Sequence, residues 1–262
     1  MKIAKIKFDG KTSYAKVEDN GYNLIGDKIF GQYAATGTII PFDKAKLLVP
    51  VEPWQIIAIG LNYRQHAIEC NMQFPKAPVV FIKTPNTITG PGSDIILPKM
   101  APDCVDYEAE LAIIIGRQAK NVTENEAGDY ILGYTCSNDV SARDCQLKQD
   151  VQWARGKCFD TFAPIGPYIV TGLNGDNLDI KLTLNGQVMQ QSNTSDLIFS
   201  CKTLVSYISR CMTLYPGSII MTGTPSGVGM GRNPQVYMKH GDKVCVEIEG
   251  IGCLENTVVT EA

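Results

Sequence analysis

Two glutamates that stand two residues apart at the head of an apolar stretch are the residues best suited to chemistry in this sequence. Glu108 and Glu110 lie in VDYEAELAIII, whose composition predicts a buried strand. Side chains at positions i and i+2 of a strand point to one face, so the two carboxylates should converge. Burying unpaired carboxylates is costly, so a cation is expected between them, and a divalent metal ion would serve. Alternatively, one glutamate faces solvent, or both lie on a sheet edge and pair with lysines.

A third carboxylate, Asp139, could join this pair. Asp139 lies in YTCSNDVSARD, directly after the β-prone run ILGYTCS, and would therefore stand at the end of a neighbouring strand. Three carboxylates without a nearby His or Cys cluster suit Mg²⁺ or Mn²⁺, with water as further ligands, better than Zn²⁺. Asp139 alone could equally be a helix N-cap.

A histidine and a glutamate form a candidate proton-transfer pair. His66 stands three residues before Glu69 in NYRQHAIEC, and on a helix this spacing lets the carboxylate meet the imidazole. A carboxylate that orients the ring supports a general base. Such a pair, taken alone, is more often a surface ion pair. The other histidine, His240, is expected in a solvated hairpin turn.

Polar side chains further along the chain could bind an anionic substrate. Arg143 and Gln146 would share one face of a helix that starts at Asp139. Lys157, in WARGKCFDTFAP, either extends along an apolar surface or is held in a cleft. In the loop MTGTPSGVGMG, backbone N–H groups and the Thr224 hydroxyl could approach an anion, although an ordinary glycine-rich turn fits equally. Around a metal, these groups would form a pocket for an oxygen-rich anion.

Composition and charge exclude several classes of protein. The net charge of the 262 residues is −3, and no run of Lys and Arg indicates nucleic-acid binding. The spacing Gly227-x-Gly229-x-Gly231 lacks the following helix that dinucleotide binding requires. No apolar run is long enough to span a membrane, and the N-terminus has no signal-peptide pattern. The nine cysteines are scattered, with no C-x-x-C spacing, which indicates buried reduced thiols in a cytoplasmic protein.

The expected architecture is α+β, because strand patterns outnumber helices and do not alternate with them. Residues 1–52 carry short alternating strands and predict a small β-rich N-terminal subdomain, followed by a larger domain over 53–262. That domain should be built on a large mixed sheet or β-roll. Asn185-Gly186 predicts a hairpin turn, and Leu197–Cys211 is the one clearly amphipathic helix.

Taken together, these segments resemble the fumarylacetoacetate hydrolase (FAH) family over about residues 55–260, which implies the FAH fold. Six motifs occur in the family's order: GLNYRQHAIE, VDYEAELAIIIG, GYTCSNDVSARDCQ, GKCFDTFAPIGP, NGQVMQ and YPGSIIMTGTPSGVG. Segments 159–171 and 212–231 look closest to the branch of FAH domain-containing protein two, which is linked with oxaloacetate tautomerisation. The long N-terminal domain of fumarylacetoacetase, with its further aspartate ligand, has no counterpart here.

The resemblance assigns roles to the candidate residues. It implies that Glu108, Glu110 and Asp139 bind Mg²⁺ or Mn²⁺ and that His66 and Glu69 activate water on a mobile lid. It places four side chains around the substrate, with Lys157 also stabilising or protonating an enolate: Arg143, Gln146, Lys157 and Thr224. FAH relatives are dimers, so a homodimer is expected.

The function expected from these roles is metal-dependent hydrolysis of a C–C bond in a small acylpyruvate-type 1,3-diketo acid, which releases pyruvate as its enolate. An oxaloacetate tautomerase or decarboxylase that uses the same site is the alternative. A non-catalytic metal-binding protein is a third class, because a fold alone does not define a function. In the first two cases the ligand is a small anionic 2-oxo acid.

Overall fold

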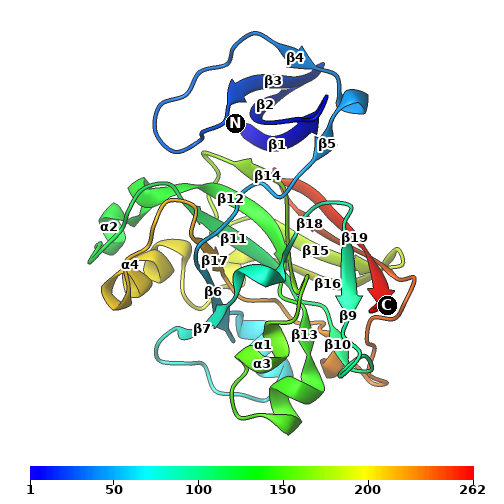
Figure 1. Ribbon diagram of the computed structural model, residues 1–262. Coiled ribbons are helices and arrows are strands. Elements are labelled where there is room, and N and C mark those ends of the chain that lie inside the picture. Colours follow the sequence, from blue (N-terminus) through cyan, green and yellow to red (C-terminus); the bar gives the residue numbers. More distant parts are fainter.

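One long mixed sheet runs through the computed structural model, which describes residues 1–262 (Figure 1). Its strands follow the order β4 (Ile39–Ile40), β3 (Gly21–Gly26), β2 (Lys11–Glu18), β1 (Lys2–Phe8), β14 (Ala163–Val170), β12 (Ile131–Asn138), β11 (Ala109–Ile115), β17 (Ile219–Met221), β6 (Ile56–Gly60) and β7 (Val79–Lys83). Two short strands pair with this sheet off the main path: β5 (Lys46–Leu47) and β8 (Ile88–Thr89).

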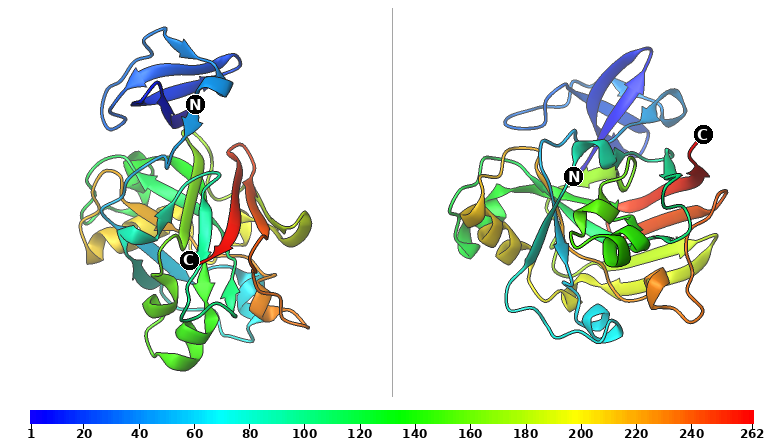
Figure 2. Two further views of the ribbon diagram at one scale, coloured as in Figure 1. Left: turned by 45° about the vertical axis from the view of Figure 1, so that its right-hand side comes forward. Right: turned by 60° about the horizontal axis from the view of Figure 1, so that its bottom comes forward.

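A second sheet packs against the first. Its order is β16 (Gln187–Asn193), β15 (Asp179–Leu184), β18 (Lys243–Ile248), β19 (Gly252–Thr260) and β9 (Asp94–Leu97). β14 contacts β19 and β12 contacts β18, so the two sheets lie face to face (Figure 2). The largest hydrophobic core, 41 buried residues, draws on both sheets and on the helix α4. A separate short ladder pairs β10 (Val105–Asp106) with β13 (Ser141–Ala142).

Helices are few and short. They are α1 (Arg64–Glu69), α2 (Glu124–Ala127), α3 (Ala154–Lys157) and α4 (Cys201–Cys211), with a π-helical segment over Cys145–Gln149. Single 3₁₀ turns occupy Phe42–Lys44, Pro85–Thr87, Gly128–Tyr130, Thr194–Asp196 and Gly229–Gly231. None of these helices has the length and apolar character needed to cross a bilayer. The α+β class expected from the sequence is confirmed.

The helix predicted over Leu197–Cys211 starts later than expected. Ser200 is its N-cap, and the Ser200 hydroxyl accepts a hydrogen bond from the backbone N–H of Thr203. Leu197 lies in the turn before the helix. Its apolar side chain continues the amphipathic sequence pattern, although the residue itself is not helical. The predicted hairpin is confirmed: Asn185 and Gly186 both have positive φ and join β15 to β16.

The strand β11 is buried on both faces, as its apolar sequence predicts. Leu111, Ile113 and Ile115 belong to the core between the sheets, whereas Ala112 and Ile114 belong to a second core on the opposite face. The alternation places Glu108 and Glu110 on the side of this second core.

Pairing between β11 and β12 brings the third carboxylate to the same place. Glu110 is opposite Ser137, Ala109 is opposite Asn138, and Asp139 follows directly. The Asp139 backbone N–H donates to the Glu108 carbonyl oxygen at 2.9 Å, which holds the two backbones together.

The N-terminal strands lie above the body in Figure 1, yet they continue its main sheet. Lys2 pairs with Val170 and Ile3 pairs with Ile169, so β1 is an antiparallel neighbour of β14. These N-terminal strands also have a small hydrophobic core of their own, which contains Ala4, Ile6 and Ala15. The division of the chain at residues 52 and 53 remains a prediction.

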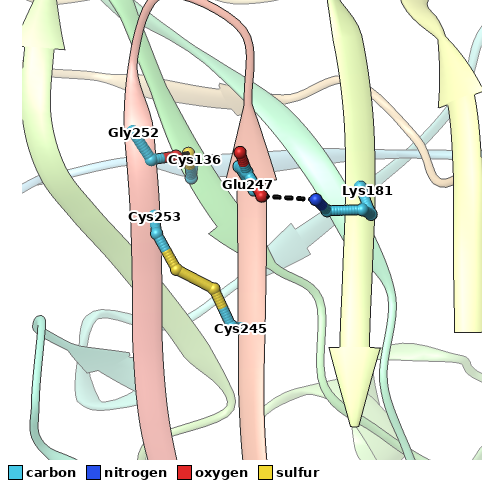
Figure 3. The surroundings of a disulfide bond; sticks show 6 residues. All are labelled: Cys136, Lys181, Cys245, Glu247, Gly252 and Cys253. Atoms are coloured by element: carbon cyan, nitrogen blue, oxygen red, sulfur yellow. Dashed lines mark hydrogen bonds and ion pairs between the residues drawn. A yellow bond between two sulfur atoms is a disulfide. The ribbon is translucent and has the colours of Figure 1, made fainter. Parts of the chain in front are cut away.

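The expectation of nine reduced, buried thiols is wrong. Cys245 on β18 and Cys253 on β19 form a disulfide on the hairpin, with a Cα–Cα distance of 6.2 Å (Figure 3). Spacing along the chain could not show this pairing, because it depends on which residues the hairpin places diagonally opposite. The other cysteines are free, and Cys211 is exposed.

Candidate metal centre and active site

The three predicted metal ligands converge. Glu108 immediately precedes β11, Glu110 lies on it, and Asp139 follows β12. One carboxylate oxygen of each residue lies within 4.8 Å of the others, and the exposed fractions are 6%, 1% and 1%. The sheet-edge alternative therefore does not hold, and neither does that of an N-cap, because no helix begins at Asp139.

Two buried lysines approach this carboxylate cluster. The Nζ atom of Lys157 lies 2.7 Å from Glu108 Oε2 and 2.6 Å from Asp139 Oδ2. Lys83, at the end of β7, reaches Asp139 Oδ1 at 2.5 Å and is itself only 1% exposed. Glu110 forms no ion pair, and its Oε2 accepts a hydrogen bond from the backbone N–H of Gly223 at 2.9 Å.

Because of this difference in ion pairing, the pKa values of Glu108 and Glu110 shift in opposite directions. Burial alone would raise the pKa of Glu108, but Lys157 and Arg143 lower it to about 2. Burial raises the pKa of Glu110 well above its usual range, and the charges of Asp139 and Glu108 add to this effect. Glu110 therefore has no ion-pair partner of its own, and the more distant charge of Lys157 only partly offsets these effects.

The donor set fits a hard divalent cation. All three candidate ligands are carboxylates, which suit Mg²⁺ or Mn²⁺, and the buried Glu110 has no other cationic partner. Apart from the His66–Glu69 pair, four buried carboxylates face three buried cationic side chains here, which leaves one negative charge when all are ionised: Asp106, Glu108, Glu110 and Asp139 against Lys83, Arg143 and Lys157. A divalent ion would turn this into one positive charge, which favours an anionic substrate.

Arg143 is oriented by an aspartate that the sequence analysis did not single out. Its Nε donates to Asp106 Oδ2 at 2.9 Å, and its Nη1 donates to Gln146 Oε1 at 2.9 Å. Its Nη2 forms an ion pair with Glu108 Oε1 at 2.7 Å. The angle at this contact does not fit a hydrogen bond, so the buried Nη2 has no hydrogen-bond acceptor. Arg143 and Gln146 do come together, but the helical segment begins at Arg143 and not at Asp139, because Ser141–Ala142 pairs with β10.

Asp106 also holds the glycine-rich loop. Its carboxylate accepts hydrogen bonds from the backbone N–H groups of Gly229 at 2.7 Å and Met230 at 3.0 Å. The N–H of Gly227 donates to Glu69. Together with the Gly223 bond to Glu110, these contacts occupy N–H groups that the sequence analysis assigned to an anionic ligand. That assignment is wrong for these groups, because the loop binds carboxylates of the protein itself.

Thr224 lies in the same loop and its side chain is already hydrogen-bonded. Its hydroxyl donates to the carbonyl oxygen of Ala109 at 2.9 Å and accepts from Gln190 Nε2 at 2.8 Å. Gln190 Oε1 in turn accepts from the Ala109 N–H. Thr224 thus connects the loop to the start of β11, and its role in substrate binding stays a prediction.

The predicted His66–Glu69 pair forms on α1. His66 Nδ1 lies 2.9 Å from Glu69 Oε2, and Cys70 Sγ lies 3.8 Å from both ring nitrogens. Burial by itself would lower the pKa of His66, but the contacts with Cys70 and Glu69 and the charge of Glu108 raise it to about 9. His66 is therefore protonated at neutral pH. His240 is exposed, as expected.

Most of these groups line one cavity of about 100 Å³. Its polar lining consists of His66, Glu108, Glu110, Asp139, Arg143, Gln146, Lys157 and Thr224, and Cys70 lies among them. Apolar side chains such as Phe81, Trp153 and Leu147 complete the walls. Lys157 also stacks its ammonium over the Phe81 ring, 5.5 Å from the centroid, so this lysine is held in a cleft.

Sequence reasoning missed Lys83 and Asp106. Lys83 ends the apolar run VVFIK, where a charged residue on a buried strand is itself a signal of function. Asp106 stands two residues before Glu108, so the same i, i+2 argument could have included it.

Comparison with known proteins agrees with this geometry. Residues 55–259 match the family described as fumarylacetoacetate (FAA) hydrolase C-terminal, and residues 1–50 match one described as Rv2993c-like, N-terminal. The chain therefore belongs to the fumarylacetoacetate hydrolase family, and its fold is the FAH fold.

Within the family, the chain is similar to members of one branch in particular. It is 53% identical to the fumarylacetoacetate hydrolase domain-containing protein 2 homolog of Dictyostelium discoideum, over 84% of this chain and 76% of that protein. It is 43% identical to the mitochondrial oxaloacetate tautomerase Fahd2a of Rattus norvegicus, over 86% of this chain and 73% of that protein.

A solved structure extends the similarity to the whole chain. The crystal structure of a 5-carboxymethyl-2-hydroxymuconate delta-isomerase from Mycobacterium smegmatis superposes with a TM-score of 0.91 and 41% identity, covering 100% of both chains.

Proposed function

We propose that this protein catalyses the keto–enol tautomerisation of a small anionic 2-oxo acid of the oxaloacetate type, with Mg²⁺ or Mn²⁺ as cofactor. The observation that carries the proposal is that one cavity contains the carboxylate cluster, a histidine that Glu69 orients, and the buried guanidinium of Arg143. The similarity to an oxaloacetate tautomerase and to an isomerase supports it.

Binding of the substrate would rely on Arg143 and Gln146. The Nη2 nitrogen of Arg143 forms an ion pair with Glu108 but no well-aligned hydrogen bond, so it can donate to a substrate carboxylate. Asp106 and Gln146 hold the guanidinium in place through Nε and Nη1, so little side-chain entropy is lost when the anion binds.

Proton transfer would rely on His66. Conversion of the enol to the keto form adds a proton at carbon and removes one from oxygen, and the imidazole that is left neutral by the first transfer can accept the second proton. An imidazolium whose pKa is raised to about 9 carries the required proton at neutral pH, and Glu69 orients the ring. In the reverse direction the neutral imidazole accepts the proton from carbon.

Charge on the reacting oxygen would be stabilised by Lys157. Its ammonium lies in the cavity between Glu108 and Asp139, so it can also donate to a substrate oxygen. Glu108, Glu110 and Asp139 would hold the divalent ion, which when bound supplies Lewis-acid stabilisation of negative charge on the 2-oxo acid.

Hydrolysis of an acylpyruvate is the second candidate, and the His66–Glu69 pair favours it. A histidine that a carboxylate orients is the arrangement that water activation needs. Water activation, however, requires a neutral imidazole, whereas the raised pKa of His66 favours the protonated ring at neutral pH. Tautomerisation ranks first because similar proteins are named as an oxaloacetate tautomerase and an isomerase. Decarboxylation of oxaloacetate is the variant of the same chemistry that releases CO₂.

The deciding experiment offers Mg²⁺-loaded and Mn²⁺-loaded protein both enol-oxaloacetate and acetylpyruvate. We expect rapid interconversion of the oxaloacetate tautomers by absorbance, intact acetylpyruvate, and no release of pyruvate from either. His66→Ala should lose about 10²–10⁴-fold in rate, and Glu69→Gln should lose less. His240→Ala is the matched control, because the other histidine is exposed. Cleavage of acetylpyruvate without acceleration of tautomerisation would establish the hydrolase instead.

A further inference from the structure

A second group of metal-binding side chains lies beside the carboxylate cluster. His66 and Glu69 on α1 and Cys70 directly after it place a nitrogen, an oxygen and a sulfur within 4.8 Å of one another. The measured separations are 2.9 Å between His66 Nδ1 and Glu69 Oε2, and 3.8 Å between His66 Nδ1 and Cys70 Sγ. Positions i, i+3 and i+4 of one helical turn bring such side chains to one face.

We propose that His66, Glu69 and Cys70 form a separate binding site for Zn²⁺ or a similar borderline-soft divalent ion. Thiolate, imidazole and carboxylate are the ligands that zinc uses, whereas the neighbouring cluster offers carboxylates only. With Zn–S near 2.3 Å and Zn–N near 2.0–2.1 Å, a tetrahedral ion separates sulfur from nitrogen by about 3.5 Å. The observed 3.8 Å is close to this value, although Sγ is equally far from Nε2. The 2.9 Å between Nδ1 and Glu69 Oε2 would have to lengthen to about 3.3 Å, so both Cys70 and Glu69 must rotate to complete the site.

The glutamate of this site is already oriented by its surroundings. Glu69 Oε1 accepts a hydrogen bond from the Gly227 N–H at 2.8 Å, which leaves Oε2 directed at His66. Gly231 packs against the same carboxyl group, where an added Cβ would lie only 2.9 Å from Cδ. Contacts that fix a ligand from behind are what metal sites use to hold their geometry.

Zinc binding would displace protons in a defined way. The ion takes the place of the proton shared by His66 Nδ1 and Glu69 Oε2, and the Cys70 thiol loses its proton to become a thiolate. Two protons leave for one divalent ion, so the net charge of the cluster is unchanged. A fourth position stays open to water on the cavity side, because His66 and Cys70 line the cavity.

Occupation of this site would regulate the neighbouring chemistry, a consequence that rests on the proposed function. With zinc on Nδ1, the ring keeps only its Nε2 proton and becomes a much weaker acid than an imidazolium, because loss of that proton would leave an imidazolate. Zn²⁺ should therefore inhibit even when Mg²⁺ fills the carboxylate cluster.

The site itself can be tested without any activity, by titrating Mg²⁺-saturated protein with Co²⁺. We expect thiolate-to-cobalt charge-transfer absorption in the near ultraviolet and the visible bands of a tetrahedral ion in wild type. Both should persist in Cys211→Ser, which alters an exposed free thiol elsewhere, and disappear in Cys70→Ser. Absence of these bands in wild type, or their survival in Cys70→Ser, overturns the proposal. Melting curves of both variants establish that they are folded.

The regulatory consequence is tested by Zn²⁺ titration of the tautomerase at saturating Mg²⁺, with each variant referred to its own zinc-free rate. Inhibition should be at least tenfold weaker in Cys70→Ser than in Cys211→Ser. Cobalt bands without zinc inhibition would refute the regulatory role and leave the site standing. Cobalt bands in a protein without tautomerase activity would contradict the proposed function alone.

Discussion

The Nζ atom of Lys157 lies 2.6 Å from Oδ2 of Asp139, so the ammonium contacts one of the three predicted metal ligands directly. The same nitrogen is 2.7 Å from Glu108 Oε2. Although burial lowers the pKa of Lys157, the charges of Asp139 and Glu108 raise it above its usual value. Lys157 is therefore a cation that stabilises the cluster when no metal is bound and that repels a metal when one is.

Replacement of Lys157 by Met should separate these two effects. Loss of the ammonium removes repulsion toward a divalent ion, so Mn²⁺ should bind at least about tenfold more tightly, while the rate falls because charge on the substrate oxygen is no longer stabilised. Isothermal titration with Mn²⁺ and the rate on enol-oxaloacetate measure the two effects. Lys181→Met, at a half-exposed surface lysine, is the control. Weaker Mn²⁺ binding in Lys157→Met would contradict this assignment.

Glu110→Gln should weaken metal binding and stabilise the metal-free protein. The amide keeps the shape of the side chain but removes a buried carboxylate without a cationic partner, so the free energy of unfolding should rise by about 1–3 kcal/mol at pH 7. Mn²⁺ affinity should fall at least about tenfold, because one anionic ligand is lost. Urea unfolding with and without Mn²⁺ measures both, with Glu255→Gln as the exposed control. Equal Mn²⁺ affinity in the two variants would show that Glu110 is no ligand.

The raised pKa of His66 predicts a pH dependence of stability in the metal-free protein. Because the pKa is about 9 in the folded chain and near 6.5 when unfolded, the stabilising effect of the protonated ring is complete below pH 6.5 and is lost as pH rises through 9. The free energy of unfolding should fall by up to about 3 kcal/mol across this window. Urea unfolding of wild type and His66→Gln from pH 6 to 10 checks this, and an equal slope in both would disprove it.

Asp106→Asn should destabilise the protein and impair substrate binding. The buried carboxylate binds Arg143 and two N–H groups of the glycine-rich loop, so its loss removes one of the two carboxylates that pair with the buried guanidinium, at a cost of about 3–5 kcal/mol. Because Arg143 would be less well oriented, KM should rise more than kcat falls. Asp129→Asn, which alters an exposed pair with Arg117, is the control. A cost below about 1 kcal/mol for Asp106→Asn would show that the anchor is unimportant.

The predicted homodimer remains to be measured. Trp54 and Tyr215 are large apolar side chains that stay exposed near each other, with exposed fractions of 87% and 49%, and a partner subunit would cover them. Light scattering at micromolar concentration should give twice the mass of 28.6 kDa. Trp54→Ser should weaken the dimer, whereas a monomer in wild type would contradict the prediction.

The sequence by itself determined those features that depend on neighbours along the chain. Glu108 and Glu110 share a face because a strand repeats every two residues, and His66 meets Glu69 because a helix brings i and i+3 together. The apolar run of β11 predicted a buried strand, and Asn185-Gly186 predicted a hairpin turn. These relations are set by backbone geometry over a few residues.

Only the tertiary structure decided which distant groups meet. Lys83 reaches Asp139 from β7, and Asp106 binds a loop more than a hundred residues away, because sheet order and register bring these segments together. The same register places Cys245 diagonally opposite Cys253. Contacts of this kind depend on how the strands pair across the whole chain, and no local pattern specifies that pairing.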